Sequence, residues 1–179
     1  MKFIDIETNG LNPYYHEPIE VAWVDLDHTV TETAFSLPFD TIGSEEKAFE
    51  VNGWGNRAFA PRLKHSDAVP LITVGLRDEI LVGNNIAFDM AFLSAYLRRH
   101  RREPTRHHSG FDLKSLVAGH MGVSPTLVTT EGIIRHFALA PQRFVRDRNE
   151  PQGPVKYHGA LYDAKWNRQI YELLNLWGG

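Results

Sequence analysis

The stretch FIDIETNGL, residues 3–11, decides how the chain begins to fold, because it places two acids inside an apolar strand. Successive residues of a strand point to opposite faces, so Asp5 and Glu7 share one face and the neighbouring isoleucines share the other. Removing two like charges from water side by side is unfavourable. A strand with this pair therefore needs a group that compensates for the two charges.

The composition restricts the class of protein. The chain has 179 residues and 42% apolar content, which suits one domain, 1–179, with a substantial core. No apolar run approaches the roughly 18 residues of a membrane span, so we expect no membrane partner. Without cysteine there are no disulfides or thiolate metal sites, which suits a cytoplasmic protein. A net charge of −3 excludes a global positive field, so any contact with nucleic acid must be local.

The expected elements begin with strands and continue with alternating strands and helices. Strands are predicted at 2–7, 19–26, 29–37, 80–82 and 111–117, and helices at 86–100, 126–137 and 161–177. A short turn at Asp27-His28 predicts an antiparallel hairpin. Residues 40–79 read as mixed structure with Gly and Pro breaks, and 141–157 as a polar loop. This order predicts an α/β fold with mixed strand directions.

Two further acids lie near the first turns of helices, on the side that the apolar pattern turns to the core. They are Asp89 and Asp163. Either one alone is explained by the helix N-terminus, where a carboxylate is favoured. Together with Asp5 and Glu7, however, they make four inward-facing acids on three elements. The economical explanation is that all four face one another around divalent cations.

A histidine precedes the last helix. His158 stands five residues before Asp163, and Gly159 leaves it on the loop, within plausible reach of the same site. A neutral imidazole is a good general base near neutral pH. The alternative is an ordinary surface histidine, which most of the nine histidines must be.

Three motifs in this order resemble the DEDDh family of 3′→5′ exonucleases, which includes proofreading subunits of bacterial polymerases, ribonuclease T and oligoribonuclease. They are DIETNGL, LVGNNIAFDMAFL and HGALYDA, beginning at Asp5, Leu81 and His158. The resemblance spans Phe3 to Leu174. The sequence departs from the family where Asn84-Asn85 replaces the usual His-Asn, and in the length of the loop before His158.

The resemblance implies a ribonuclease H-like fold, with a central mixed β-sheet flanked by helices. It also implies two Mg²⁺ or Mn²⁺ ions at the acids, and release of nucleoside 5′-monophosphates from the 3′ end of single-stranded DNA or RNA. A homodimer or a polymerase partner is compatible with it.

The family's roles transfer to matching positions. By resemblance, Asp5 bridges both ions, Glu7 and Asp163 bind one of them, and Asp89 holds the other, directly or through water. His158 takes a proton from the attacking water. The terminal-nucleotide pocket is lined by Thr8, Leu11, Asn85 and Phe88.

Two other functions compete with this interpretation. Asp25-x-Asp27 after an apolar strand is similar to the nucleophile motif of haloacid-dehalogenase-type phosphatases, but we find no convincing second acidic pair, and a hairpin turn is favoured. A non-catalytic nucleic-acid-binding module on a nuclease fold would be indicated by loss of an acid ligand, and none is lost.

The most basic stretch runs from Leu97 to His108, with arginines from Arg98 to Arg106. Two interpretations stay open for it: a solvated helix end, or a patch that contacts phosphates. His107 and His108 have no cysteine or clear carboxylate partner, so a zinc site is not expected.

Overall fold

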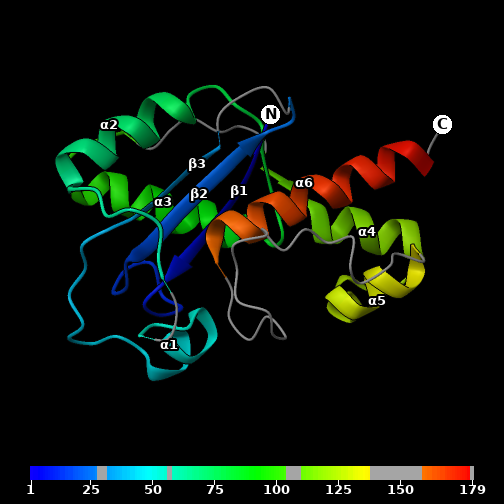
Figure 1. The fold of residues 1–179 in the computed structure, drawn as a ribbon, viewed down its shortest axis with the longest axis horizontal. Coiled ribbons are helices and arrows are strands. Elements are labelled where there is room, and N and C mark those ends of the chain that lie inside the picture. Colours follow the sequence, from blue (N-terminus) through cyan, green and yellow to red (C-terminus); the bar gives the residue numbers. More distant parts are fainter. Residues whose placement is uncertain (28–31, 56–57, 104–109, 138–158, 178–179) are drawn as a thin grey trace.

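A computed structural model describes residues 1–27, 32–55, 58–103, 110–137 and 159–177. Among these residues, five strands form one sheet in the order β3-β2-β1-β4-β5, and Figure 1 labels the first three of this order. The strands are β1 (Lys2–Thr8), β2 (Pro18–Asp25), β3 (Thr33–Ser36), β4 (Leu81–Gly83) and β5 (Gly110–Asp112). β1, the strand that carries the paired acids, lies at the centre.

The sheet has mixed strand directions, as the sequence predicted. β2 pairs with both β1 and β3 in antiparallel fashion, which confirms the expected antiparallel pairing of the second and third strands. The residue His28 of the predicted turn lies outside the described residues. β4 and β5 continue the sheet on the other side of β1 in parallel.

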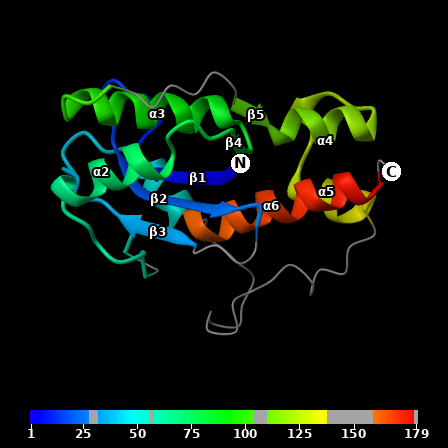
Figure 2. The same ribbon diagram turned by 90° about the horizontal axis from the view of Figure 1, so that it is seen from above.

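Helices cover both faces of the sheet (Figure 2). They are α1 (Glu46–Asn52), α2 (His65–Gly75), α3 (Ile86–Arg99), α4 (Leu113–Met121), α5 (Thr130–His136) and α6 (Ala160–Trp177), with a 3₁₀ turn η1 (Pro125–Leu127) before α5. One buried apolar cluster joins the sheet to α2 and α3, and a second joins it to α4, α5 and α6. None of the described helices is both long and apolar enough to cross a membrane.

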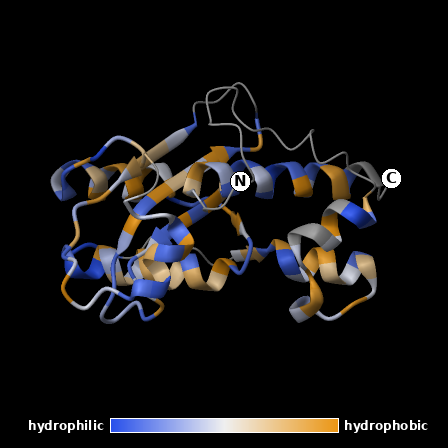
Figure 3. Ribbon diagram, turned by 60° about the horizontal axis from the view of Figure 1, so that its bottom comes forward, coloured by the Kyte–Doolittle hydropathy of each residue, from blue (hydrophilic) through white to orange (hydrophobic). Residues whose placement is uncertain are grey.

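Alternation along β1 decides which face receives the acids. Ile4 and Ile6 belong to the cluster with α2 and α3, whereas Phe3 belongs to the cluster with α6. Asp5 and Glu7 follow Phe3 at intervals of two residues and therefore face α6. Hydrophobic and hydrophilic residues alternate along α6, as expected for a helix with one face on the core (Figure 3).

The predicted strand at 111–117 is wrong beyond its first residues. β5 ends at Asp112, and α4 begins at Leu113. The Asp112 carboxylate accepts a hydrogen bond from the Ser115 N–H at 2.7 Å, which starts the helix. Leu113 and Val117, four residues apart, are both buried, so the apolar run has the period of a helix.

Two other stretches also differ from expectation. The predicted helix at 126–137 is interrupted by extended Val128 between η1 and α5, and Thr129 caps α5 by accepting from the Gly132 N–H at 3.0 Å. Residues 40–79, read as broken by Gly and Pro, contain the helices α1 and α2. Pro70 lies inside α2, where the missing N–H removes one backbone hydrogen bond without ending the helix.

Candidate active site

Three carboxylates gather where the end of β1 meets the start of α6. Asp5 and Glu7 come from β1, and Asp163 comes from the first turn of α6. Each offers an oxygen, and these oxygens all lie within 4.8 Å of one another. Glu7 is buried, while Asp5 and Asp163 keep partial contact with solvent. The structure thus brings together three of the four acids predicted from sequence.

Two alanines and the side-chain amide of Asn167 allow α6 to pack closely on β1, which brings Asp163 near Asp5 and Glu7. Ala160 and Ala164 are fully buried, so the helix approaches the sheet closely. Asn167, also buried, donates from Nδ2 to the Ile4 carbonyl of β1 at 3.4 Å. The Asp163 N–H donates to the Gly159 carbonyl at 3.0 Å, which sets the first helical turn.

Asp89 reaches the same region from the other face, along the edge of β1 that faces β4. The Lys2 N–H donates to Ile80 on this edge, and alternate residues of a strand point the same way, so the Ile6 N–H lies on this edge as well. β4 is too short to pair with it. The Asp89 Oδ1 accepts from the Ile6 N–H at 3.0 Å instead, and the Asp89 side chain is buried.

The crowding of these acids changes their proton affinity. Burial, followed by the charges of Asp89 and Asp163, raises the pKa of Asp5 well above its ordinary value. Burial also raises the pKa of Asp89 to about 8, with Glu7 and Asp112 acting in the same direction and hydrogen bonds from backbone N–H groups opposing them. Without a cation, the cluster therefore resists full ionisation. An all-carboxylate donor set fits hard divalent cations such as Mg²⁺ and Mn²⁺.

A fifth acid, Glu20, was not identified from the sequence. It lies directly opposite Glu7 in the β1–β2 ladder and is 4% exposed. Its Oε1 accepts from the Ala60 N–H at 2.8 Å, and its Oε2 accepts from the Ala160 N–H at 3.1 Å. Glu20 thereby fastens the first residue of α6 to β2. The available signal was the one used for β1: an acid inside an otherwise apolar strand, IEVAWV.

The predicted substrate residues lie at the end of β1 and the start of α3. Thr8 is buried and donates from Oγ1 to the Gly10 carbonyl at 2.7 Å, whereas Leu11 is 71% exposed. Asn85 has a left-handed backbone, with φ of 64°, just before α3. Phe88 is half-buried, with its ring centroid 4.7 Å from that of Phe92. No contact with a nucleotide tests these four positions, so their role stays a prediction.

His158 and the loop 141–157 lie outside the described residues. Gly159, the neighbour of His158, is placed directly before α6. The general-base role of His158 therefore stays a prediction.

The phosphatase alternative does not fit the position of Asp25. This residue pairs with Lys2 at the opposite end of the β1–β2 ladder from Glu7. The Lys2 ammonium lies 2.6 Å from the Asp25 carboxylate and forms an ion pair with it. The arrangement favours a structural role at the end of the strand.

The chain is similar to known exonucleases in sequence and in fold. A family model described as an exonuclease matches residues 3–171. The zinc-bound form of Escherichia coli exonuclease I in complex with single-stranded DNA is 18% identical, with a TM-score of 0.69, over 98% of this chain and 40% of that chain. The complex of the same enzyme with a dA16 oligonucleotide is 17% identical, with a TM-score of 0.70 over the same shares.

These matches define the family and the fold. The chain spans about 40% of the length of the exonuclease I structures. The likeness in fold confirms the expected ribonuclease H-like architecture, with a mixed sheet flanked by helices. Because the family model covers almost the whole chain and the acids of its motifs stand in order around β1, the chain belongs to the exonuclease family, with the DEDDh arrangement of residues.

Proposed function

We propose that the chain is a metal-dependent 3′→5′ exonuclease that hydrolyses single-stranded nucleic acid and releases nucleoside 5′-monophosphates. The observation that carries this proposal is the group of three carboxylates within 4.8 Å, with Asp89 beside the same strand. Membership of the exonuclease family supports the reaction class. The exonuclease I structures contain single-stranded DNA, which favours DNA as the first substrate to test.

We infer that the acids hold two Mg²⁺ or Mn²⁺ ions, as the family resemblance implies, and the cluster of three carboxylates supports a metal site here. Asp5, Glu7 and Asp163 would hold one ion, and Asp5 together with Asp89 would hold the second. Such a pair, when bound, stabilises charge on the attacking and leaving oxygens of a phosphoryl displacement.

The remaining residues prepare the substrate for this displacement. Exposed Leu11 and half-buried Phe88 would contact the terminal base from two elements, and Thr8 and Asn85 would complete the pocket. His158 would accept the proton of the attacking water. Glu20 holds the start of α6, and hence Asp163, at a fixed place on the sheet.

The proposal is tested with 5′-labelled single-stranded DNA and RNA in Mg²⁺, in Mn²⁺ and in EDTA. We expect a descending ladder that requires metal and is abolished in Asp163→Asn. Asp67→Asn, which changes an exposed aspartate on α2, serves as the matched control and should keep parental activity. Failure to degrade either polymer under any metal would contradict the proposal.

The role of His158 is tested separately. General-base catalysis contributes roughly 10²–10⁴-fold, so His158→Asn should lower the single-turnover rate at neutral pH by about that factor. Affinity for Mn²⁺ should stay near the parental value. The control is His136→Asn, an exposed histidine of α5. A near-parental rate would remove His158 from the mechanism, and a collapse of Mn²⁺ affinity would assign it to metal binding instead.

A further inference from the structure

Arg99, at the end of α3, fastens the turn that follows the first motif. Its guanidinium donates to the Pro13 carbonyl at 2.6 Å and to the His16 carbonyl at 2.7 Å. It also pairs with the Glu17 carboxylate at 3.3 Å. Arg99 is therefore engaged within the protein, and the basic end of α3 lies against the turn at residues 13–16.

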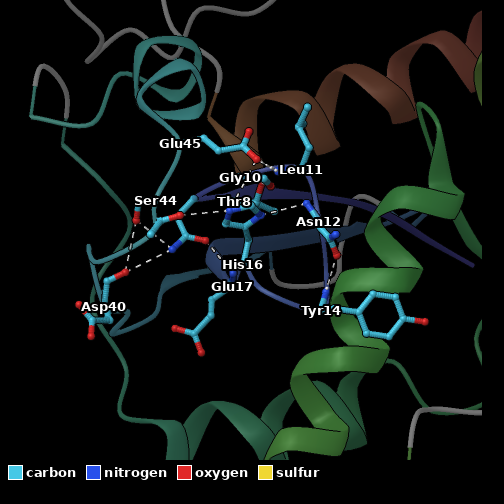
Figure 4. A network of polar contacts seen from close by, with 12 residues as sticks. Thr8, Gly10, Leu11, Asn12, Tyr14, His16, Glu17, Asp40, Ser44 and Glu45 are labelled. Atoms are coloured by element: carbon cyan, nitrogen blue, oxygen red, sulfur yellow. Dashed lines mark hydrogen bonds and ion pairs between the residues drawn. The ribbon is translucent and has the colours of Figure 1, made fainter.

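The turn at residues 13–16 is also stabilised by hydrogen bonds among its own residues and Asn12 (Figure 4). The Asn12 side chain accepts from the Tyr14 N–H at 2.9 Å, and the Asn12 carbonyl accepts from the N–H groups of Tyr15 and His16. His16 Nδ1 accepts in return from the Asn12 N–H at 3.0 Å. A Cβ on Gly10 would lie 2.5 Å from the His16 ring, so the first motif packs directly on this turn.

Two tyrosines project from this fixed turn. The Tyr14 residue is 86% exposed and Tyr15 is 82% exposed. Figure 4 shows the Tyr14 ring directed away from the hydrogen-bonded network, while Leu11 projects from the same segment. Large exposed rings on an ordered backbone offer stacking surface at a small entropic cost, because the backbone is already fixed.

Three further arginines flank Arg99 in the sequence. Arg98, Arg101 and Arg102 are exposed at the end of α3. The Arg102 N–H donates to the Leu97 carbonyl at 2.9 Å, so the backbone at this helix end is ordered. Arg99 thus holds the turn that carries the exposed rings against the end of α3, where the exposed arginines lie in the sequence.

We propose that the turn at residues 13–16 and the end of α3 form one binding surface, here called the strand platform, for the single-stranded substrate upstream of the cleaved nucleotide. Tyr14 and Tyr15 stack on bases, and Arg98, Arg101 and Arg102 contact phosphates. This inference rests on the proposed function. Proteins that bind single strands without sequence preference combine these two kinds of contact.

The platform is continuous with the candidate active site through the chain itself. Tyr14 follows Glu7 by seven residues in the sequence. Asp89 lies in the first turn of α3 and Arg98 in its last turn, and Arg101 and Arg102 follow the helix directly. The occupant is a nucleic-acid strand because the surface offers both stacking rings and cations, although the whole chain carries a net charge of −3.

The aromatic part is tested by the affinity for fluorescent oligothymidines in EDTA, where hydrolysis is blocked. The double variant Tyr14→Ala/Tyr15→Ala should bind a twelve-nucleotide strand at least about 25-fold more weakly, since each base stacked on an aromatic ring contributes about fivefold or more. The dinucleotide should lose less than about twofold. Tyr14→Phe/Tyr15→Phe should restore binding, because the rings remain.

The control for exposed apolar surface is Leu127→Ala, at a residue 67% exposed on η1. It should bind both strands with parental affinity. If the double alanine variant binds the twelve-nucleotide strand as tightly as the parent, the platform is overturned.

The basic part is tested by salt dependence. Replacing Arg98, Arg101 and Arg102 with Gln should reduce the slope of log K against log salt by about 2, because each phosphate contact on a single strand contributes roughly 0.7. Arg77→Gln is the matched control, since this exposed arginine lies three residues before Ile80 and hence near the opposite end of β1. An unchanged slope in the triple variant would remove the arginines from the platform.

These measurements separate the platform from the proposed reaction. Binding that depends on length and on both tyrosines, in a protein that degrades no polymer, supports the platform and contradicts the exonuclease proposal. Degradation that needs Asp163 but not the tyrosines does the reverse.

Discussion

Asp89 combines two conditions that oppose each other. Its carboxylate accepts a backbone hydrogen bond, which favours the ionised form, but it is 3% exposed and has acidic neighbours, which favour the neutral form. The second influence is the stronger one, because the pKa rises to about 8. In the metal-free protein, Asp89 therefore holds a proton at pH values where an aspartate in an unfolded chain has lost it.

This proton predicts how the stability of the metal-free protein depends on pH. Below about pH 4 both the folded and the unfolded state are protonated, and the raised pKa has no effect on stability. Between about pH 4 and pH 8 the folded state binds more protons, so its free energy of unfolding falls as pH rises. One retained proton gives a slope of about −1.4 kcal/mol per pH unit.

Asp89→Asn should make this dependence less steep, because the amide cannot titrate while its oxygen can still accept from Ile6, and Asp5, whose pKa is also raised, keeps its own contribution. Urea unfolding in EDTA at several pH values measures it. Asp67→Asn, at an exposed position of α2, is the control and should keep the parental slope. Equal slopes for parent and Asp89→Asn would show that this carboxyl titrates normally.

At the scale of elements, α6 depends on β2 for its position. Glu20 joins the two by accepting from the Ala160 N–H, and its other oxygen accepts from Ala60. Both partners are donors, so both oxygens must be acceptors. An amide in this place can satisfy only one of them and presents an N–H₂ group to the other.

Glu20→Gln should therefore displace the start of α6 and, with it, Asp163. We expect a loss of about 1–3 kcal/mol in the free energy of unfolding, the usual effect of an unsatisfied buried group. As a positioning residue, Glu20 should affect kcat and Mn²⁺ affinity while leaving KM near the parental value. Glu50→Gln, at an exposed position of α1, is the matched control. A loss of stability with parental kcat and Mn²⁺ affinity would assign Glu20 a structural role alone.

Sequence patterns predicted the elements whose periodicity is simple. β1 and α3 were located from alternating or helical apolar spacing, and α6 was located in the same way. The strand predicted at 111–117 failed because a side-chain cap at Asp112 starts a helix within an apolar run, and the apolar pattern does not show where a cap acts. The sequence did not indicate α2, because residues 40–79 read as mixed structure with Gly and Pro breaks, although burial of one face stabilises the helix around Pro70.

The sequence indicates the acids of the candidate site but not the contacts that hold them in position. The four acids are indicated by the sequence alone, because charged residues in apolar surroundings are unusual. The sequence did not show that Arg99 is engaged by the turn at residues 13–16 or that Glu20 caps α6. Both contacts join residues more than eighty positions apart, and no local pattern encodes such distances.

For the whole molecule, a bound cation would join distant parts of the chain. Asp5 and Asp163 belong to the first strand and the last helix, and Asp89 comes from the middle. A ligand that binds only the folded state stabilises it by about 2.7 kcal/mol at a concentration one hundred times its dissociation constant. Mg²⁺ should therefore raise the melting temperature, by roughly 5–10 °C for a chain of this size.

Asp163→Asn should lose most of this metal-induced rise. Without metal it should melt no lower than the parent, because removing one of several crowded carboxylates relieves repulsion. Thermal unfolding with and without Mg²⁺ measures both effects, and Asp67→Asn again provides the control. A parental metal-induced rise in Asp163→Asn would contradict the assignment of Asp163 as a ligand.

The shortness of β4 has a consequence for how this chain can be altered. Asp89 reaches the Ile6 N–H only because the ladder between β1 and β4 stops before that point. An insertion that lengthened β4 by two residues would give Ile6 an ordinary strand partner and a more regular sheet. The same change would remove the hydrogen bond from the Ile6 N–H to Asp89 and displace the Asp89 carboxylate from β1. A redesign that lengthens the sheet at this edge is therefore expected to yield a more stable but inactive protein. Insertions should be least tolerated at residues 84–85, which connect β4 to α3.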